Sequence, residues 1–286
     1  MRRVHPALWL FPVPALALYL TFFVLPAVQG VQYAVTDWDG FSPTFSQVGA
    51  DNFTEIAGGD DLFRNALTNN LKFLFVVVVC QTALSLLLAV LLARRSRAST
   101  ALRALFFLPT ILSSVSVAFV WRFVYDPNFG LANRVLGLVG VEGSFLGDDA
   151  TAILWVALAQ VWFHAGQMMI VYIAGLNQIP ASLYEAARTD GASRWQLFRH
   201  VTWPMVAPAT ALVLAYTTIQ SFKAFDLVLG LGGNPPRPPL DILSTRIYTT
   251  FADSRFGYAA AESLVFMVII ALVTWLQNRA ARSAHG

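Results

Sequence analysis

The chain has 286 residues, of which 57% are hydrophobic and only 12% are charged. This composition, with a mean hydropathy of +0.60, excludes an ordinary soluble domain and indicates a membrane protein. The formal net charge of +3 does not indicate a nucleic-acid partner, because the basic residues are spread over several loops instead of lying on one soluble domain.

Apolar segments recur along the chain at lengths suited to a lipid bilayer. A helix that rises about 1.5 Å per residue needs about 20 apolar residues to cross about 30 Å of hydrocarbon. The alternating strands of a membrane barrel are absent from the sequence. We therefore predict an all-α membrane protein that forms one transmembrane domain over residues 1–286. The six expected spans are residues 7–28, 73–93, 104–121, 152–176, 205–221 and 258–276.

Three segments near these spans need a separate interpretation. The first expected span follows two arginines but is longer than the apolar part of a signal peptide and ends without a small-residue cleavage site, so we expect it to be retained. Residues 60–70 have a helix-like pattern, and we expect a short helix along the membrane surface. Residues 230–239 are rich in glycine and proline, which predicts turns without a helix.

Charge divides the loops into two groups. Arginines gather at both termini, between the second and third spans, and in residues 177–204, and these segments contain only two acids, Glu185 and Asp190. The remaining loops contain most of the aspartates and glutamates. By the positive-inside rule, both termini and residues 177–204 are predicted to be cytoplasmic.

The connection between the fourth and fifth spans is polar and densely patterned. Ser182 with Glu185, and Ser193 with Gln196, predict two short helices that each begin with a capping box. Gly191 lies between them, where a left-handed residue would end the first helix. A hairpin whose caps only keep it folded is one interpretation. A DNA-binding domain is not, because membrane spans begin close on both sides.

Polar residues also lie within two expected spans. Polar side chains are costly in hydrocarbon, so these stripes should face protein or water. They are Gln160, Phe163, His164 and Gln167 in the fourth span, and Thr217, Gln220 and Ser221 in the fifth. Two interpretations stay open: hydrogen bonds between helices, or a substrate pathway in which amides and hydroxyls bind a sugar and an aromatic ring stacks on it. Lys223 with Asp226, and Glu262, are predicted to form structural pairs or gate contacts.

Motifs of catalysis are absent from the sequence. It contains no G-x-x-x-x-G-K-[ST] phosphate loop, no paired His and Cys metal ligands, and no H-E-x-x-H or G-x-S-x-G sequence. We therefore predict no catalytic residues and no metal site, and any energy from nucleotide hydrolysis must come from another chain.

A longer pattern runs through the polar connection. Glu185-Ala186-Ala187 is followed after three residues by Gly191 and, after nine more, by Val201-Thr202-Trp203-Pro204. This spacing resembles the E-A-A-x3-G-x9-I-x-L-P loop of ABC importer permeases, with Val and Trp in place of Ile and Leu. Asp190-Gly191-Ala192 is similar to the D-G-A of their carbohydrate-type, or maltose-type, branch. Residues 36–38, 105–109 and 221–226 also resemble that branch, so the resemblance covers nearly the whole chain.

The resemblance implies a type I ABC importer permease in a bacterial or archaeal inner membrane. Residues 177–204 would then contain the coupling helix that docks on a separate ATPase. The implied coupling residues are Tyr184, Glu185, Ala186, Ala187, Asp190, Gly191 and Ala192. The implied partners are a second homologous permease, two ATP-binding subunits that hold ATP and Mg, an extracytoplasmic substrate-binding protein and membrane lipid. The chain itself is expected to bind no cofactor.

The expected function is therefore that of a permease subunit, which forms half of the translocation pathway for sugars or related solutes. The alternative is an ion-coupled secondary transporter of a small polar solute. Such a transporter is expected to carry more ionisable residues within the membrane, whereas most charges here lie in loops.

Overall fold

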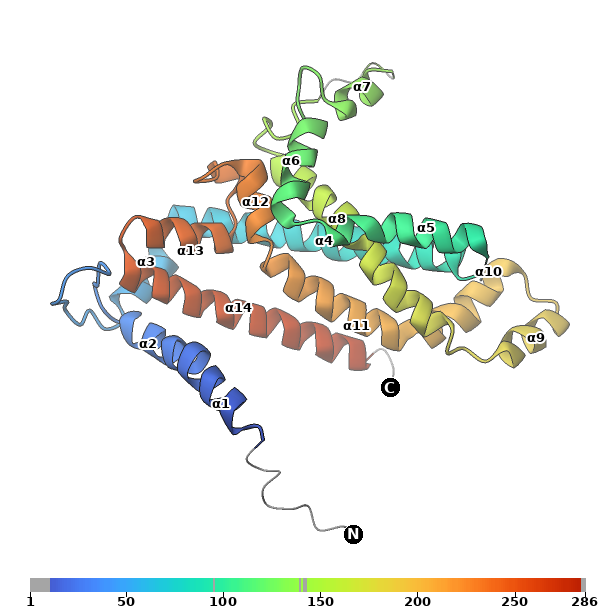
Figure 1. The fold of residues 1–286 in the computed structure, drawn as a ribbon, viewed down its shortest axis with the longest axis horizontal. Coiled ribbons are helices and arrows are strands. Elements are labelled where there is room, and N and C mark those ends of the chain that lie inside the picture. Colours follow the sequence, from blue (N-terminus) through green and yellow to red (C-terminus); the bar gives the residue numbers. More distant parts are fainter. Residues whose placement is uncertain (1–10, 95, 139, 141–142, 284–286) are drawn as a thin grey trace, which may run out of the picture. The chain divides into compact units, whose positions relative to one another are not determined.

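The computed structural model describes residues 11–94, 96–138, 140 and 143–283, and these are mostly helical (Figure 1). In this part of the chain the only β-type pairing is an isolated bridge between Thr36 and Gln47. The chain divides into two compact units, residues 1–61 with 247–269, and residues 62–246 with 270–286.

Unit one contains the first span and the first half of the last one. The first span is helical from Val13 to Tyr33, with a short π-helical stretch, and part of the predicted span, residues 7–10, lies outside the described residues. The elements are α1 (Val13–Tyr19), η2 (Leu20–Val24), α2 (Leu25–Tyr33), α3 (Asp51–Gly58), most of α13 (Leu243–Ala252) and the start of α14 (Phe256–Ser283).

Unit two contains the other spans and their connections. Its elements are α4 (Asp61–Leu92, from its second residue), α5 (Arg97–Phe107), η3 (Leu108–Ile111), α6 (Ser114–Val124), α7 (Leu131–Gly137), α8 (Ala152–Leu176), α9 (Ala181–Thr189), α10 (Arg194–Leu197), η4 (Phe198–Thr202), α11 (Trp203–Phe222), α12 (Phe225–Gly232) and η5 (Pro238–Leu240). The most buried of the candidate spans is α8, which contributes to both hydrophobic clusters of this unit.

Six spans were predicted, and the described residues contain five or six candidates. Five helices are long and apolar enough to cross a membrane, and the number is six if one bent pair of helices is counted as a single span. The fourth span, Ala152–Leu176, has the predicted ends. The second is longer than predicted, because α4 runs without interruption from Asp61 to Leu92 and includes most of residues 60–70. A separate surface helix there was therefore the wrong expectation.

The third expected span, residues 104–121, is not one straight helix. The segments on either side of residues 112–113 meet at 103°. Pro109 lacks a backbone N–H, and the Ser113 hydroxyl accepts a hydrogen bond from the Ser116 N–H, which starts a new helix. A hydropathy window averages over such a break and cannot detect it.

Residues 230–232 belong to helix α12, so the prediction of turns throughout residues 230–239 was wrong. A Cβ atom on Gly230 would lie 2.5 Å from the Cβ of Ala118, so glycine here permits close packing of α12 on α6. The turn begins at Gly233, whose φ of +91° is left-handed.

Candidate functional site

A cavity of about 250 Å³ lies where several helices of unit two are interrupted. Helix α6 begins at its edge, α11 ends there and α12 begins there, while α8 passes alongside. Backbone away from regular helix is tolerated at membrane depth only beside protein or a water-filled space. The polar lining comes from Ser114, Gln160, His164, Gln220, Lys223 and Asp226, and Phe163, Tyr216 and Phe225 add aromatic rings.

Four of the seven residues predicted for the pathway line this cavity: Gln160, Phe163, His164 and Gln220. Gln160 and Phe163 are buried within the chain, and the ring of Phe163 lies 4.0 Å from that of His164, centroid to centroid. The structure thus brings residues of α8 and α11 together around one polar space. Their role toward substrate stays a prediction.

The other three predicted residues are engaged in contacts between or within helices. The Nε2 of Gln167 donates to the hydroxyl of Tyr216 at 3.1 Å. The hydroxyl of Thr217 accepts from Gln81 Nε2 at 3.1 Å, and that of Ser221 donates to the backbone carbonyl of Thr217 at 2.7 Å. Hydrogen bonding between or within helices therefore accounts for these three residues, and the substrate pathway stays a prediction.

Lys223 and Asp226 line the cavity as two exposed charges. Within the described residues neither takes part in an ion pair, so the predicted pair between them is not formed. The third residue of that prediction, Glu262, is buried in unit one. A solute in the cavity would meet one ammonium group and one carboxylate.

The coupling segment, residues 177–204, connects α8 to α11 and contains the two predicted short helices, α9 and α10 (Figure 1). The capping box of Ser182 and Glu185 is not formed, because α9 begins at Ala181 and Pro180 takes the cap position. The box of Ser193 and Gln196 is formed: the Gln196 N–H donates to the Ser193 hydroxyl, and the Ser193 N–H donates to Gln196 Oε1 at 2.7 Å.

Gly191 ends helix α9 as predicted, with a left-handed φ of +79°. The N–H of Ala192 donates to the carbonyl of Ala187 at 2.9 Å, and the N–H of Gly191 donates to that of Arg188 at 3.0 Å. This pair of bonds is the Schellman arrangement, which satisfies the last carbonyls of a helix. Gly191 therefore has a local structural reason to be glycine.

One implied coupling residue points inward and most of the others lie at the surface. The hydroxyl of Tyr184 lies 3.1 Å from that of Thr202, and its side chain packs on the hydrophobic cluster of α4, α8 and α11. The exposed coupling residues are Glu185, Ala186, Asp190 and Gly191, and Ala187 and Ala192 are half-buried. Tyr184 thus anchors α9 and leaves one face of the helix free.

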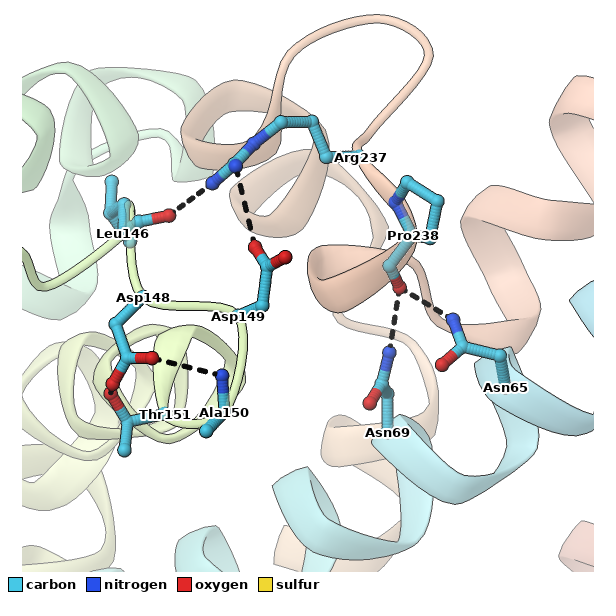
Figure 2. Close-up of polar contacts among 9 residues, drawn as sticks. All are labelled: Asn65, Asn69, Leu146, Asp148, Asp149, Ala150, Thr151, Arg237 and Pro238. Carbon is cyan, nitrogen blue, oxygen red and sulfur yellow. Dashed lines mark hydrogen bonds and ion pairs between the residues drawn. The ribbon is translucent and has the colours of Figure 1, made fainter.

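The clamp segment, residues 237–245, is held by side chains of α4 (Figure 2). Two amides, of Asn65 and Asn69, donate to the carbonyl of Pro238 at 2.6 and 2.9 Å. Asn69 also donates to the carbonyl of Asp241 at 3.0 Å. The segment is therefore tied to a span far away in the sequence.

The same segment is also linked to the start of α8 and holds a buried acid. Arg237 donates to the carbonyl of Leu146 and lies 3.5 Å from the Asp149 carboxylate (Figure 2). Asp241 is buried and accepts a hydrogen bond from the Thr245 hydroxyl at 2.6 Å. Burial raises the pKa of Asp241 to about 6, against the smaller lowering effects of Thr245 and nearby positive charge. The sequence offered no signal for this clamp beyond a group of asparagines.

The described residues combine apolar helices of spanning length with a polar cavity at the point where helices are interrupted. This combination is typical of a membrane transport protein with several spans. The family model for the binding-protein-dependent transport system inner membrane component matches residues 81–285. The chain belongs to this family, whose members are membrane components and not enzymes.

Individual relatives and solved structures agree with this membership. The chain is 34% identical to the probable ABC transporter permease protein YurN of Bacillus subtilis (strain 168), over 95% of this chain and 94% of that one. It is 31% identical to the probable starch degradation products transport system permease protein AmyD of Thermoanaerobacterium thermosulfurigenes, over 94% and 91%. A bacterial alginate ABC transporter, solved in complex with an alginate pentasaccharide-bound periplasmic protein, has the same fold, with a TM-score of 0.82, 24% identity and coverage of 98% and 95%. The predicted importer-permease fold is thereby confirmed.

Proposed function

We propose that the chain is the permease subunit of an ATP-driven, binding-protein-dependent importer of sugars or related solutes. The observation that carries this proposal is the coupling segment: the E-A-A spacing lies on a short helix that is closed by its own hydrogen bonds, anchored by Tyr184 and otherwise exposed. A helix held in this way can transmit a displacement, whereas a flexible loop would absorb it in its torsion angles.

The cavity supports a carbohydrate as the transported solute. Carboxamides of Gln160 and Gln220 and the hydroxyl of Ser114 offer donors and acceptors to sugar hydroxyls, and Phe163 and Tyr216 offer aromatic faces. A relative that carries starch degradation products and a structural neighbour that carries alginate are consistent with this class.

The assembly follows from the same reasoning. A second homologous permease would complete the pathway, and two ATPase subunits would hold ATP and Mg and contact α9 from the cytoplasm. A substrate-binding protein would deliver the solute on the opposite side. The arginine distribution supports cytoplasmic termini and a cytoplasmic coupling segment. Closure of the ATPases would then move α9 and α10 and open the cavity alternately to the two sides.

The test is uptake by the complete transporter in proteoliposomes. Loaded binding protein should stimulate ATP hydrolysis, and Glu185→Ala should lower both uptake and stimulated hydrolysis about tenfold if Glu185 loses a charge-assisted contact with the ATPase. Asp253→Ala, which removes an exposed carboxylate in a different loop, is the matched control and should leave both unchanged. Uptake that proceeds without ATP and follows an ion gradient would support the secondary transporter instead.

A further inference from the structure

Gln81 is an amide in the middle of an apolar span. It lies in α4 and is fully buried, and its Nε2 faces two acceptors on α11. The Thr217 hydroxyl lies 3.1 Å away and Gln220 Oε1 lies 3.5 Å away. The Oε1 of Gln81 is buried without a hydrogen-bond partner among the described residues.

A contact that only joins two helices does not account for this arrangement. One hydrogen bond to Thr217 would serve that purpose, and an unpartnered buried carbonyl costs about 1–3 kcal/mol. The neighbouring residue Ser85 shows the simpler solution: it is fully buried on the same helix and donates a single hydrogen bond, at 2.9 Å, to the carbonyl of Ala165 in α8. Gln81 thus has a second contact, to Gln220, that joining the two helices does not require.

The second acceptor of Gln81 Nε2, the Oε1 of Gln220, bears on what Gln220 presents to the cavity. Its Oε1 is turned toward Gln81, so its Nε2 is on the opposite side of the carboxamide and makes no hydrogen bond to the described residues. Gln220 lines the cavity, and so does Lys223, one turn further along. Both groups are hydrogen-bond donors.

We propose that Gln81 is a positioning residue, which holds the Gln220 carboxamide with its N–H groups toward the cavity and thereby selects a solute that offers an acceptor oxygen there. This inference rests on the proposed function and assigns the substrate chemistry of the same site: a sugar hydroxyl, ring or carboxylate oxygen placed against the end of α11. Without Gln81, the carboxamide can rotate and present its carbonyl instead.

The experiment uses the complete transporter in proteoliposomes with its binding protein. The probes are labelled oligosaccharides of glucose, N-acetylglucosamine and uronate, together with glycerol phosphate, and the measured quantity is solute transported per ATP hydrolysed. Gln81→Leu and Gln220→Leu should each lower this ratio about tenfold, the loss of one hydrogen bond of about 1.4 kcal/mol. The double variant should transport as much solute per ATP hydrolysed as Gln220→Leu alone, because the two residues act through one donor.

Ser85→Ala is the matched control for a purely structural role. It removes a buried hydrogen bond of α4 that has no link to the cavity, so it should lower the thermal unfolding temperature while leaving the transport ratio unchanged. A Gln81→Leu ratio equal to that of the unmodified protein, or an equal loss in Ser85→Ala, would overturn the inference. If loaded binding protein does not stimulate ATP hydrolysis by the unmodified transporter, the proposed function fails instead, so the two failures are distinguishable.

Discussion

The coupling segment joins two helices of unit two, and the clamp segment leads from α12 into α13, but the two segments are built in opposite ways. In the coupling segment, Ser193 bonds with Gln196 and Ala192 with Ala187, so the bonds that shape it join residues three to five apart. In the clamp segment, the bonds from α4 join residues 169 to 173 apart, and one acid is buried. The first segment holds its own shape, while the second depends on the helices around it.

This difference indicates a division of roles. A segment that keeps its conformation by local bonds can expose a whole face to another subunit without destabilising the rest of the chain. A segment tied to α4 and α8 must move with those helices. Loss of the hydrogen bonds that hold it should therefore lower the free energy of unfolding of the whole unit. Substitutions in the clamp segment should therefore change the free energy of unfolding, whereas substitutions in the coupling segment should change transport.

The largest loss of stability is expected from Asn69→Leu. This change removes two hydrogen bonds near a buried site, one to the carbonyl of Pro238 and one to the carbonyl of Asp241. Their loss should lower the free energy of unfolding by about 2–4 kcal/mol. Thermal unfolding in detergent measures it. Asn65→Leu removes a single, exposed bond and is the control, expected to cost about 1 kcal/mol or less. Equal effects of the two variants would mean that the clamp segment is not held mainly by the buried amide.

A smaller effect should appear as a pH dependence that Asp241 causes. Its folded pKa, raised to about 6, means that folding favours the neutral carboxyl, so its contribution to stability is present at low pH and is lost as the pH rises through about 6. From pH 5 to pH 7.5 this loss is about 1–2 kcal/mol. Asp241→Asn should remove that pH dependence in unfolding experiments. Asp253→Asn, at an exposed acid, should retain it.

The smallest change in stability, with a large change in transport, is expected at Gly191. A Cβ there would meet nothing within 4 Å, so only the backbone conformation matters. Ala disfavours a φ of +79° by about 1–2 kcal/mol, which should alter the direction in which α10 leaves α9. We expect Gly191→Ala to lower ATP-driven uptake while the unfolding temperature of the unit changes little.

Gly191→Asn is the matched variant, because Asn tolerates the left-handed conformation. It should retain more uptake than Gly191→Ala. The reverse order, or a loss of stability as large as that of Asn69→Leu, would contradict the distinction between the two segments.

The sequence by itself determined the features that depend on near neighbours or on composition. The fourth expected span has the ends that the apolar pattern predicted, because that segment is apolar along its whole length, and local rules placed Gly191 and the Ser193 cap. Ser182 shows the limit of such rules, since a proline two residues earlier began the helix before it.

Only the tertiary structure decided what distant segments do to one another. The helical Gly230 against Ala118 and the Asn69 amide on the clamp segment each depend on a partner that no periodicity indicates. Gln81 is the clearest case. Within its own apolar span it is only a polar side chain that is unfavourable in hydrocarbon. The role that we propose for it depends on α11, which places Thr217 and Gln220 beside it, 136 and 139 residues later in the sequence. Hydrophobic burial selects which segments become helices, but close packing selects which side chains meet.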